Sequence, residues 1–378
     1  MALTPNVLTG LTPTIYRALD IVSRELVGFI PSVSRDTSEA MAAKDQIIRI
    51  PITQSAGAVD IAPASASPES GNQTVPYVDM SITKAKMVPV QWTGEEEKAM
   101  GGQFSGILAN QFAQAMRTLA NEVEADLAQL YKKASRAYGT AAQTPFASTI
   151  ADSAQMRRLL LDNGAPITGM RMVIDTLAGA NLRSLTNLSK VNEAGTDDTL
   201  RRGVLLDLNG FQIRESAGFV SHTKGAYTTG DTTGADEPVG ETAIAVASGA
   251  GDYVAGDVIW FGTDTAHKYV VASATTSVIT IAEPGLKVAV PSGATVTIAA
   301  NYTPNLCFDT NAIKLLARQP AMPSIGDSAD DIMVVTDPVS GLPFQIALYK
   351  QYRGVHYEVG LAWGCQLIKP EHTAILLG

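Results

Sequence analysis

The segment 104–137, FSGILANQFAQAMRTLANEVEADLAQLYKKASRA, constrains the fold more than any other part of the chain. Its larger apolar residues recur at steps of three and four, which places them on one stripe of an α-helix, and the heptad of a free coiled coil is not sustained. At about 1.5 Å per residue, such a helix spans roughly 50 Å. We therefore expect it to lie across several other elements or subunits. The stripe consists of Phe104, Ile107, Leu108, Phe112, Met116, Leu119, Val123, Leu127, Leu130 and Tyr131.

The composition limits the function classes. The chain has 378 residues, of which 46% are hydrophobic and 17% charged, with a formal net charge of −9. This length allows two or three domains. Direct nucleic-acid binding needs several converging cations, and no basic cluster is denser than pairs such as those at 132–133 and 201–202. We therefore expect no direct nucleic-acid binding, and the absence of an apolar run of about 18 residues predicts no membrane span.

The N-terminus and the cysteines indicate the compartment. The first residues, MALTPNVLTG, lack the basic and apolar regions of a signal peptide, so we expect none. Cys307 and Cys365 are isolated in apolar sequence, which favours buried free thiols of a protein made in a reducing cytosol. A single disulfide between them is the alternative.

The N-terminal quarter of the chain predicts an arm and a hairpin. Residues 14–29 carry an amphipathic helix pattern within an arm, 1–45. Two strand-like stretches follow in 46–95, QIIRIPI and YVDMSITKAKMVPVQW, separated by 55–74, which is rich in Ala, Ser, Pro and Gly. That composition predicts a flexible tip. Because a lone hairpin is marginal in water, we expect it to lie along a neighbouring subunit.

The rest of the chain alternates in character. After the helical segment, 96–150, residues 151–221 read as a compact α+β unit, with a helix capped by Asp152 and ended at Gly164, a strand at 170–175, a helix at 176–187 and a strand at 210–216. Residues 222–303 carry short strands with Gly-rich turns, typical of an inserted β-barrel. They are ETAIAVAS, DVIWFG, KYVVAS, SVITIAE and ATVTIAAN. The α+β character resumes at 304–335, and 336–378 predicts antiparallel strands.

No constellation of residues indicates catalysis. The histidines, at 222, 267, 356 and 372, have no neighbour at metal-ligand spacing. The glycine pattern GAGDYVAG (249–256) has strand signals on both sides, unlike a dinucleotide fingerprint. There is no GxSxG, and the adjacent carboxylates at 197–198 and 330–331 fall in loop-like sequence. We therefore expect no enzyme activity, no cofactor and no metal.

This order of parts resembles the major capsid (coat) protein of tailed bacteriophages over nearly the whole chain. The subgroup it resembles is the coat proteins of short-tailed, Salmonella-type phages, which carry an inserted β-barrel domain. Three stretches support this locally: LANEVE (119–124), AGDVIWFG (255–262) and FDTNAIKLLARQPAMP (308–323).

The resemblance implies an α+β fold with named parts. Residues 1–45 correspond to the N-arm, 46–95 to the E-loop, 96–150 to the P domain with its long spine helix, 151–221 and 304–335 to the A domain, 222–303 to the inserted small β-barrel domain, and 336–378 to terminal strands of the A and P domains. The insertion looks shorter than in the best-known member. Crosslinking members need an E-loop lysine, and 55–74 has none, so we expect no crosslink.

The resemblance also implies residues for assembly. The E-loop contacts would come from Ile52, Val59, Ile61, Val75, Tyr77 and Met80. The spine-helix core would be Phe104, Leu108, Phe112, Leu119, Val123 and Leu127. The long acidic loop with which the best-known member contacts a neighbour across two-fold axes has no clear counterpart here. The segment Gly230–Glu241, with Asp231, Asp236 and Glu237, is the candidate for a replacement between capsomers.

The expected function is that of a virion shell protein. Copies assemble as hexamers and pentamers on a scaffolding protein in the bacterial cytoplasm, forming an icosahedral procapsid that joins a portal protein and expands around packaged double-stranded DNA. A decoration protein is a further candidate partner. A nanocompartment shell of the same fold, or a phage tail or receptor-binding structural protein, is the alternative.

Overall fold

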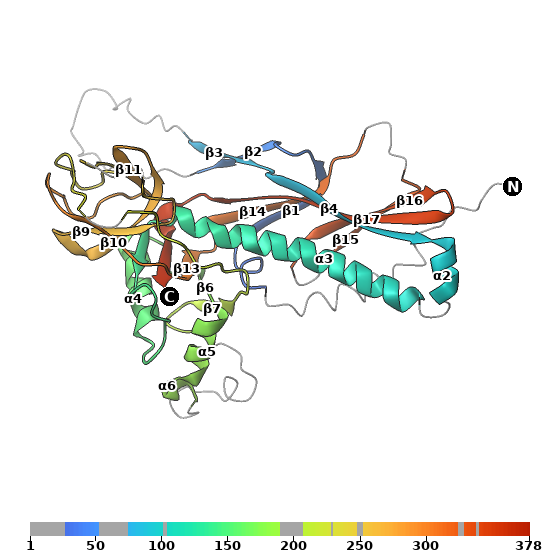
Figure 1. Ribbon diagram of the computed structural model, residues 1–378, viewed down its shortest axis with the longest axis horizontal. Helices are drawn as coiled ribbons and strands as arrows, with labels where there is room; N and C mark the ends of the chain where they lie inside the picture. The colour runs from blue at the N-terminus through green and yellow to red at the C-terminus, as the bar shows by residue number, and fades with distance from the viewer. Residues whose placement is uncertain are drawn as a thin grey trace, which may run out of the picture.

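The computed structural model describes residues 27–52, 75–100, 104–189, 207–227, 230–247, 252–323, 329–337 and 340–378. Within these residues the fold is α+β, and the long helix α3 (Phe104–Ala128) runs along much of the molecule (Figure 1). A six-stranded sheet lies along the helix, a ten-stranded sheet lies near its C-terminal end, and a two-stranded hairpin stands beside them.

The six-stranded sheet is organised around its longest strand, β17 (Gly354–Leu367). Along its first half β17 pairs with β16 (Pro343–Gln351), and along its second half with β14 (Ile313–Pro320). Its other edge pairs with β4 (Lys84–Thr93). The outer strands are β15 (Asp331–Thr336), antiparallel to β16, and β1 (Ser34–Ala42), parallel to β14. The antiparallel pairing predicted for the C-terminal strands is therefore confirmed.

The predicted long helix is confirmed, but it ends earlier than expected. Helix α3 has 25 residues and spans about 38 Å rather than 50 Å. The chain continues as a 3₁₀ turn, η3 (Gln129–Lys133), and then as β5 (Arg136–Tyr138). The last residues leave the helix because β5 pairs with strands on both sides, β10 (Asp264–Ala274) and β18 (Thr373–Leu377). Sheet pairing thus overrides the local helix propensity.

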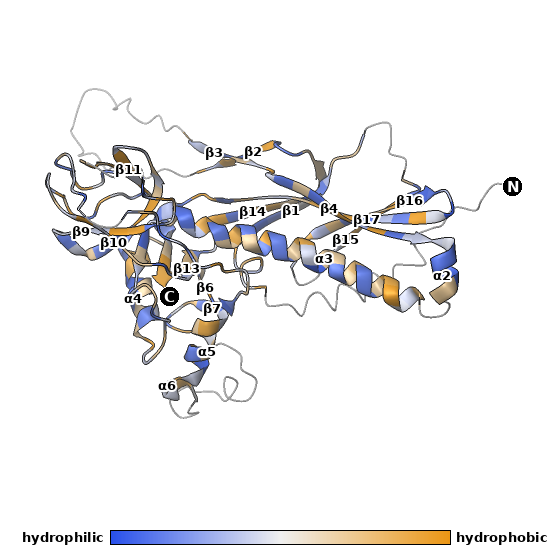
Figure 2. Cartoon of the chain, in the orientation of Figure 1, coloured by the Kyte–Doolittle hydropathy of each residue, from blue (hydrophilic) through white to orange (hydrophobic). Residues whose placement is uncertain are grey.

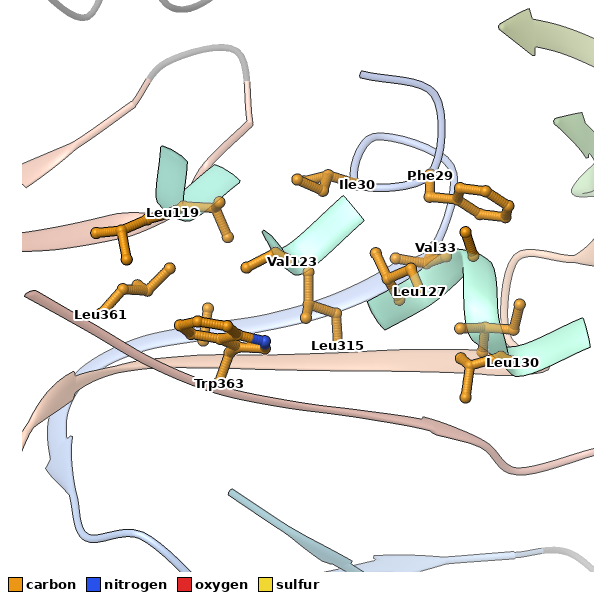
Figure 3. Packing of buried hydrophobic residues seen from close by; sticks show 14 of the residues in the cluster. Phe29, Ile30, Val33, Leu119, Val123, Leu127, Leu130, Leu315, Leu361 and Trp363 are labelled. Atoms are coloured by element: carbon orange, nitrogen blue, oxygen red, sulfur yellow. The ribbon is translucent and has the colours of Figure 1, made fainter. Parts of the chain in front are cut away.

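The apolar stripe of α3 packs against the six-stranded sheet. Leu119, Val123 and Leu127 face side chains of β14 and β17 (Figure 3). Polar and apolar patches alternate along the helix (Figure 2), as expected of an element with one buried face. Each buried leucine stabilises the fold by about 1.5–3 kcal/mol relative to an exposed one.

The second strand-like stretch of the predicted hairpin divides into two strands. Only β3 (Tyr77–Ser81) pairs with β2 (Ile47–Pro51), whereas β4 joins the six-stranded sheet. The break falls at Ile82, which is buried, and at Thr83, whose N–H donates to Trp363 O. Burial and this bond turn the chain from the hairpin into the sheet. The predicted tip, 55–74, lies outside the described residues.

Half of the ten-stranded sheet, named the axial sheet here, consists of β6 (Met170–Ile174), β7 (Gln212–Glu215), β13 (Pro304–Asp309), β18 and β5. Helices α4 (Ala151–Asp162), α5 (Thr176–Ser184) and α6 (Thr186–Ser189) accompany it, so the helix predicted at 176–187 is broken after Ser184. Gly164 ends α4 as predicted, with a φ of 81°. Asp152 does not cap α4, because it lies inside the first turn and accepts from the Phe146 N–H instead.

The insertion forms a ring of antiparallel strands. β8 (Ala243–Ala245), β11 (Val278–Ile281), β10, β9 (Val258–Phe261) and β12 (Val296–Ile298) pair in that order, so the five predicted strands are all present. Residues 231–234 close the ring between β12 and β8. Val296 N donates to Asp231 O at 2.9 Å, and Gly234 N donates to Ala245 O at 2.9 Å. The ring encloses a separate apolar core, and closure leaves few free strand edges.

Candidate subunit interface

The β2–β3 hairpin exposes large apolar side chains. Ile47, Val75 and Tyr77 have relative exposures of 60%, 67% and 54%. Arg49 lies over the Tyr77 ring at 4.4 Å and pairs with Asp79 at 3.1 Å, which orients the ring on the hairpin surface. Large apolar groups concentrated on a projecting hairpin are typical of a surface that another molecule covers.

The predicted hairpin contacts fall into three groups. Val75 and Tyr77 are exposed, and Ile52 is half-buried beside the β2–β3 pair. Met80 is fully buried within the chain, where it packs with Ile82 and Leu316. Val59 and Ile61 lie outside the described residues. The described hairpin therefore presents Val75 and Tyr77, and adds Ile47, which the sequence analysis did not select.

A groove lies on the face of the six-stranded sheet turned away from α3. Ile346 and Leu348 belong to the core under α3, so their alternating neighbours on β16 point to the opposite face. A groove of about 210 Å³ occurs there. Its lining is mainly small and apolar, with two charged residues, Lys86 and Glu358, and one amide, Gln345. The other lining residues are Ala85, Met87, Ala347, Tyr349, Gly360 and residues 320–323.

The residues predicted for the helix core and for the acidic loop occupy different environments. Leu108, Phe112, Leu119, Val123 and Leu127 are at most 1% exposed, and Phe104 is half-buried against Trp92. Asp231 and Glu237 are buried in the ring, whereas Asp236 is exposed. Because residues 231–234 pair with β12 on one side and β8 on the other, this part of the segment belongs to the ring and does not project as a loop.

Glu124 is a buried carboxylate that the sequence analysis did not select. It accepts hydrogen bonds from the N–H groups of Gly28 and Phe29 at 2.7 Å, from Ile30 at 3.1 Å, and from the Ser216 hydroxyl at 2.6 Å. Burial raises its pKa, and these four hydrogen bonds oppose the rise. The Glu124 side chain of α3 thus fixes the position of residues 28–30, at the end of the N-terminal arm. Residues 27–29 form no helix in consequence, unlike the prediction for 14–29; the part before residue 27 lies outside the described residues.

Three of the four histidines, all of which lie in the described residues, pair with a carboxylate, and of these partners only that of His222 is distant in sequence. His222 is buried, with Nε2 at 2.8 Å from Asp257 and Nδ1 at 2.9 Å from the Tyr131 hydroxyl. Desolvation raises the pKa of Tyr131 to about 12. His267 pairs with Asp264, and His356 with Glu358. The buried cluster of His222, Asp257 and Tyr131 joins the ring to the end of α3, and sequence spacing alone could not reveal it.

The described residues contain no metal-binding cluster. No group of three or more histidine, cysteine or acidic side chains is placed to hold a metal within the described ranges. No helix in the same ranges is long and apolar enough to cross a membrane. Both cysteines are free; burial raises the pKa of Cys307, and raises that of Cys365 to about 12. Cys365 is half-buried rather than fully buried as predicted.

Comparison with known proteins gives structural matches alone. No protein-family model and no curated protein match the chain. A solved structure of Mycobacterium phage Che8 is similar over 89% of this chain and 85% of its own, with 12% identity and a TM-score of 0.44. The capsid of Cyanophage P-SCSP1u is similar over 91% and 86%, with 12% identity and a TM-score of 0.44. A virus-like particle from Pyrococcus furiosus is similar over 97% and 98%, with 10% identity and a TM-score of 0.42. TM-scores below 0.5 at such identities do not establish the function.

Proposed function

We propose that this chain is the major capsid protein of a tailed bacteriophage, a shell subunit whose hairpin lies on a neighbouring copy. The observation that carries the proposal is the exposed apolar surface of the β2–β3 hairpin, together with an open groove on the sheet face opposite α3. In a monomer both surfaces face water. In a shell, the hairpin of one copy covers the sheet of the next.

Assembly in this proposal is driven by apolar burial. Each square ångström of apolar surface removed from water contributes about 25 cal/mol. A two-stranded hairpin is marginal alone, so seating it on a neighbour also stabilises the hairpin. Each subunit contributes one such contact and receives another, and many weak contacts around a closed shell sum through multivalency.

The finer assignment is the short-tailed, Salmonella-type subgroup with an inserted domain. The closed ring with its own core supports an inserted module. Scaffolding-dependent assembly into a procapsid, a portal partner, and expansion around double-stranded DNA belong to the same proposal. The net charge of −9 suits a shell that encloses DNA without retaining it. The protein acts by assembly rather than as an enzyme, in the host cytoplasm and then in the virion.

The hairpin contact can be tested with the double variant Ile47→Ser, Tyr77→Ser. Both side chains are exposed in the monomer, so we expect its free energy of unfolding to stay within about 0.5 kcal/mol of the wild type. Loss of the apolar contact should abolish closed shells, as scored by sedimentation and negative-stain microscopy. Ile167→Ser, which removes a similarly exposed apolar side chain from the loop between α4 and β6, is the matched control and should assemble. Normal shell yield from the hairpin variant would refute the contact.

A further inference from the structure

A cavity lined by cations lies where the ring meets the axial sheet. It is bordered by β5, β10, α4 and the turn that contains Lys287, and it has a volume of about 60 Å³. Arg136, Arg158, Lys268 and Lys287 line it, and Asp162 is the one carboxylate among its lining residues. His267 is also at the rim, where Asp264 holds its ring. This concentration of positive charge occurs in a chain whose net charge is −9.

Arg136 is the buried cation of this cavity. Its side chain is 2% exposed, and its guanidinium lies over the Tyr269 ring at 4.7 Å. Nη2 donates to Gly285 O at 3.0 Å. Nη1 is buried and has no hydrogen-bond partner among the described residues. Buried donors in folded proteins are nearly always satisfied, so this nitrogen is available to an acceptor bound in the cavity.

The surrounding contacts fix the walls of the cavity. The Tyr269 hydroxyl donates to Asp264 at 2.7 Å and accepts from the Lys287 N–H at 3.1 Å, which holds the turn in place. Lys268 donates to Gly139 O, and burial lowers its pKa. An anion beside Lys268 would offset that loss of solvation. The site is therefore built from side chains that the ring and the axial sheet position together.

We propose that this cavity binds a small oxyanion. The cavity is small, about 60 Å³, against about 300–1,000 Å³ for typical small-molecule sites, which suits a compact group such as phosphate or a carboxylate. Guanidinium groups bind such oxyanions through paired, charge-assisted hydrogen bonds. The bound anion joins β5 to the ring at the point where β10 pairs with it. This inference does not depend on the proposed shell function.

The test is thermal unfolding of the purified full-length chain in inorganic phosphate, with sodium chloride at matched ionic strength as the reference. A site that binds the folded state alone raises the Tm in a saturable way. We expect phosphate to raise the Tm above the chloride reference, and isothermal titration to give one site per chain. Acetate distinguishes the source of the anion. A saturable rise of the Tm in acetate but not in phosphate would assign the site to a side-chain carboxylate of a partner. A saturable rise in phosphate would assign it to a dissolved anion.

The variant that isolates the site is Arg158→Ala, Lys287→Ala. Both residues are exposed, so the chain should still fold, and Arg136 keeps its structural contacts. We expect the anion affinity to fall at least tenfold. Lys98→Ala, which removes an exposed cation from α2 (Gly94–Met100), is the control and should bind like the wild type. Equal Tm values in phosphate, acetate and chloride, or unchanged affinity in the double variant, would overturn the proposal.

Discussion

Glu124 and Glu122 lie two residues apart on α3 and have opposite environments. Glu124 is 3% exposed and accepts four hydrogen bonds, three of them from the N–H groups of residues 28–30. Glu122 is half-exposed and pairs with Lys86 at 2.6 Å. The periodicity of α3 places Glu124 three residues before Leu127, on the buried side. Its burial could have been predicted from that position, but not its partners, which lie more than ninety residues away in the chain.

Replacing Glu124 with alanine should destabilise the chain strongly. The change leaves three buried N–H groups without an acceptor, each costing about 1–3 kcal/mol. We expect a loss of about 3 kcal/mol or more in the free energy of unfolding, measured by chemical denaturation. Glu122→Ala removes a half-exposed ion pair from the same helix and should cost about 1 kcal/mol or less. Similar losses for both variants would contradict the buried role of Glu124.

The raised pKa of Glu124 gives this site a pH dependence. Because burial raises the pKa, the folded chain holds the proton to a higher pH than the unfolded chain does. The stability from this group is fully present below the unfolded pKa and is lost as the pH rises through the folded pKa. We expect the free energy of unfolding of the wild type to fall, relative to Glu124→Gln, across that window. If the wild type instead gained free energy of unfolding relative to Glu124→Gln as the pH rose, the hydrogen bonds to the carboxylate would have lowered its pKa by more than burial raises it.

At the scale of elements, periodicity predicted which elements exist better than where they end. The stripe of α3 and the five strands of the ring follow from apolar spacing. The early end of α3 does not, because it depends on β5 pairing with β10 and β18, which come much later in the chain. The division between β3 and β4 has the same origin: the Thr83 N–H finds its acceptor on Trp363. The sequence of a segment does not indicate which distant strand or carbonyl group it will pair with.

The ring should fold without the rest of the chain. Its two ends meet, since His222 N donates to Tyr302 O at 2.7 Å, and it has its own apolar core. We expect a fragment of residues 222–303 to unfold cooperatively when followed by circular dichroism and tryptophan fluorescence. A fragment of residues 222–290 lacks β12 and opens the ring, so it should show no cooperative transition. The same outcome for the longer fragment would contradict an independent module.

At the scale of the whole molecule, the apolar surface that stays exposed to solvent indicates where another copy would bind. Helix α3 covers one face of the six-stranded sheet. On the opposite face, Met80 and Ile82 cover the part at Leu316 and Ala362, while the groove and the outer side of the hairpin present apolar groups to solvent. Sequence reasoning placed the hairpin at an interface because a lone hairpin is marginal in water. It could not identify Ile47 as exposed or Met80 as buried, because both have the same strand-like context and differ in which face meets Leu316.

The most direct test of the shell proposal is negative-stain microscopy of the wild-type chain expressed in a bacterium, with and without its phage's scaffolding protein. We predict closed shells of uniform size that require the scaffold. Uniform shells without the scaffold would remove the evidence for scaffolded assembly and leave a nanocompartment shell as an equal explanation. Monomers or small oligomers under both conditions would contradict the shell function and return the chain to the class of tail or receptor-binding proteins.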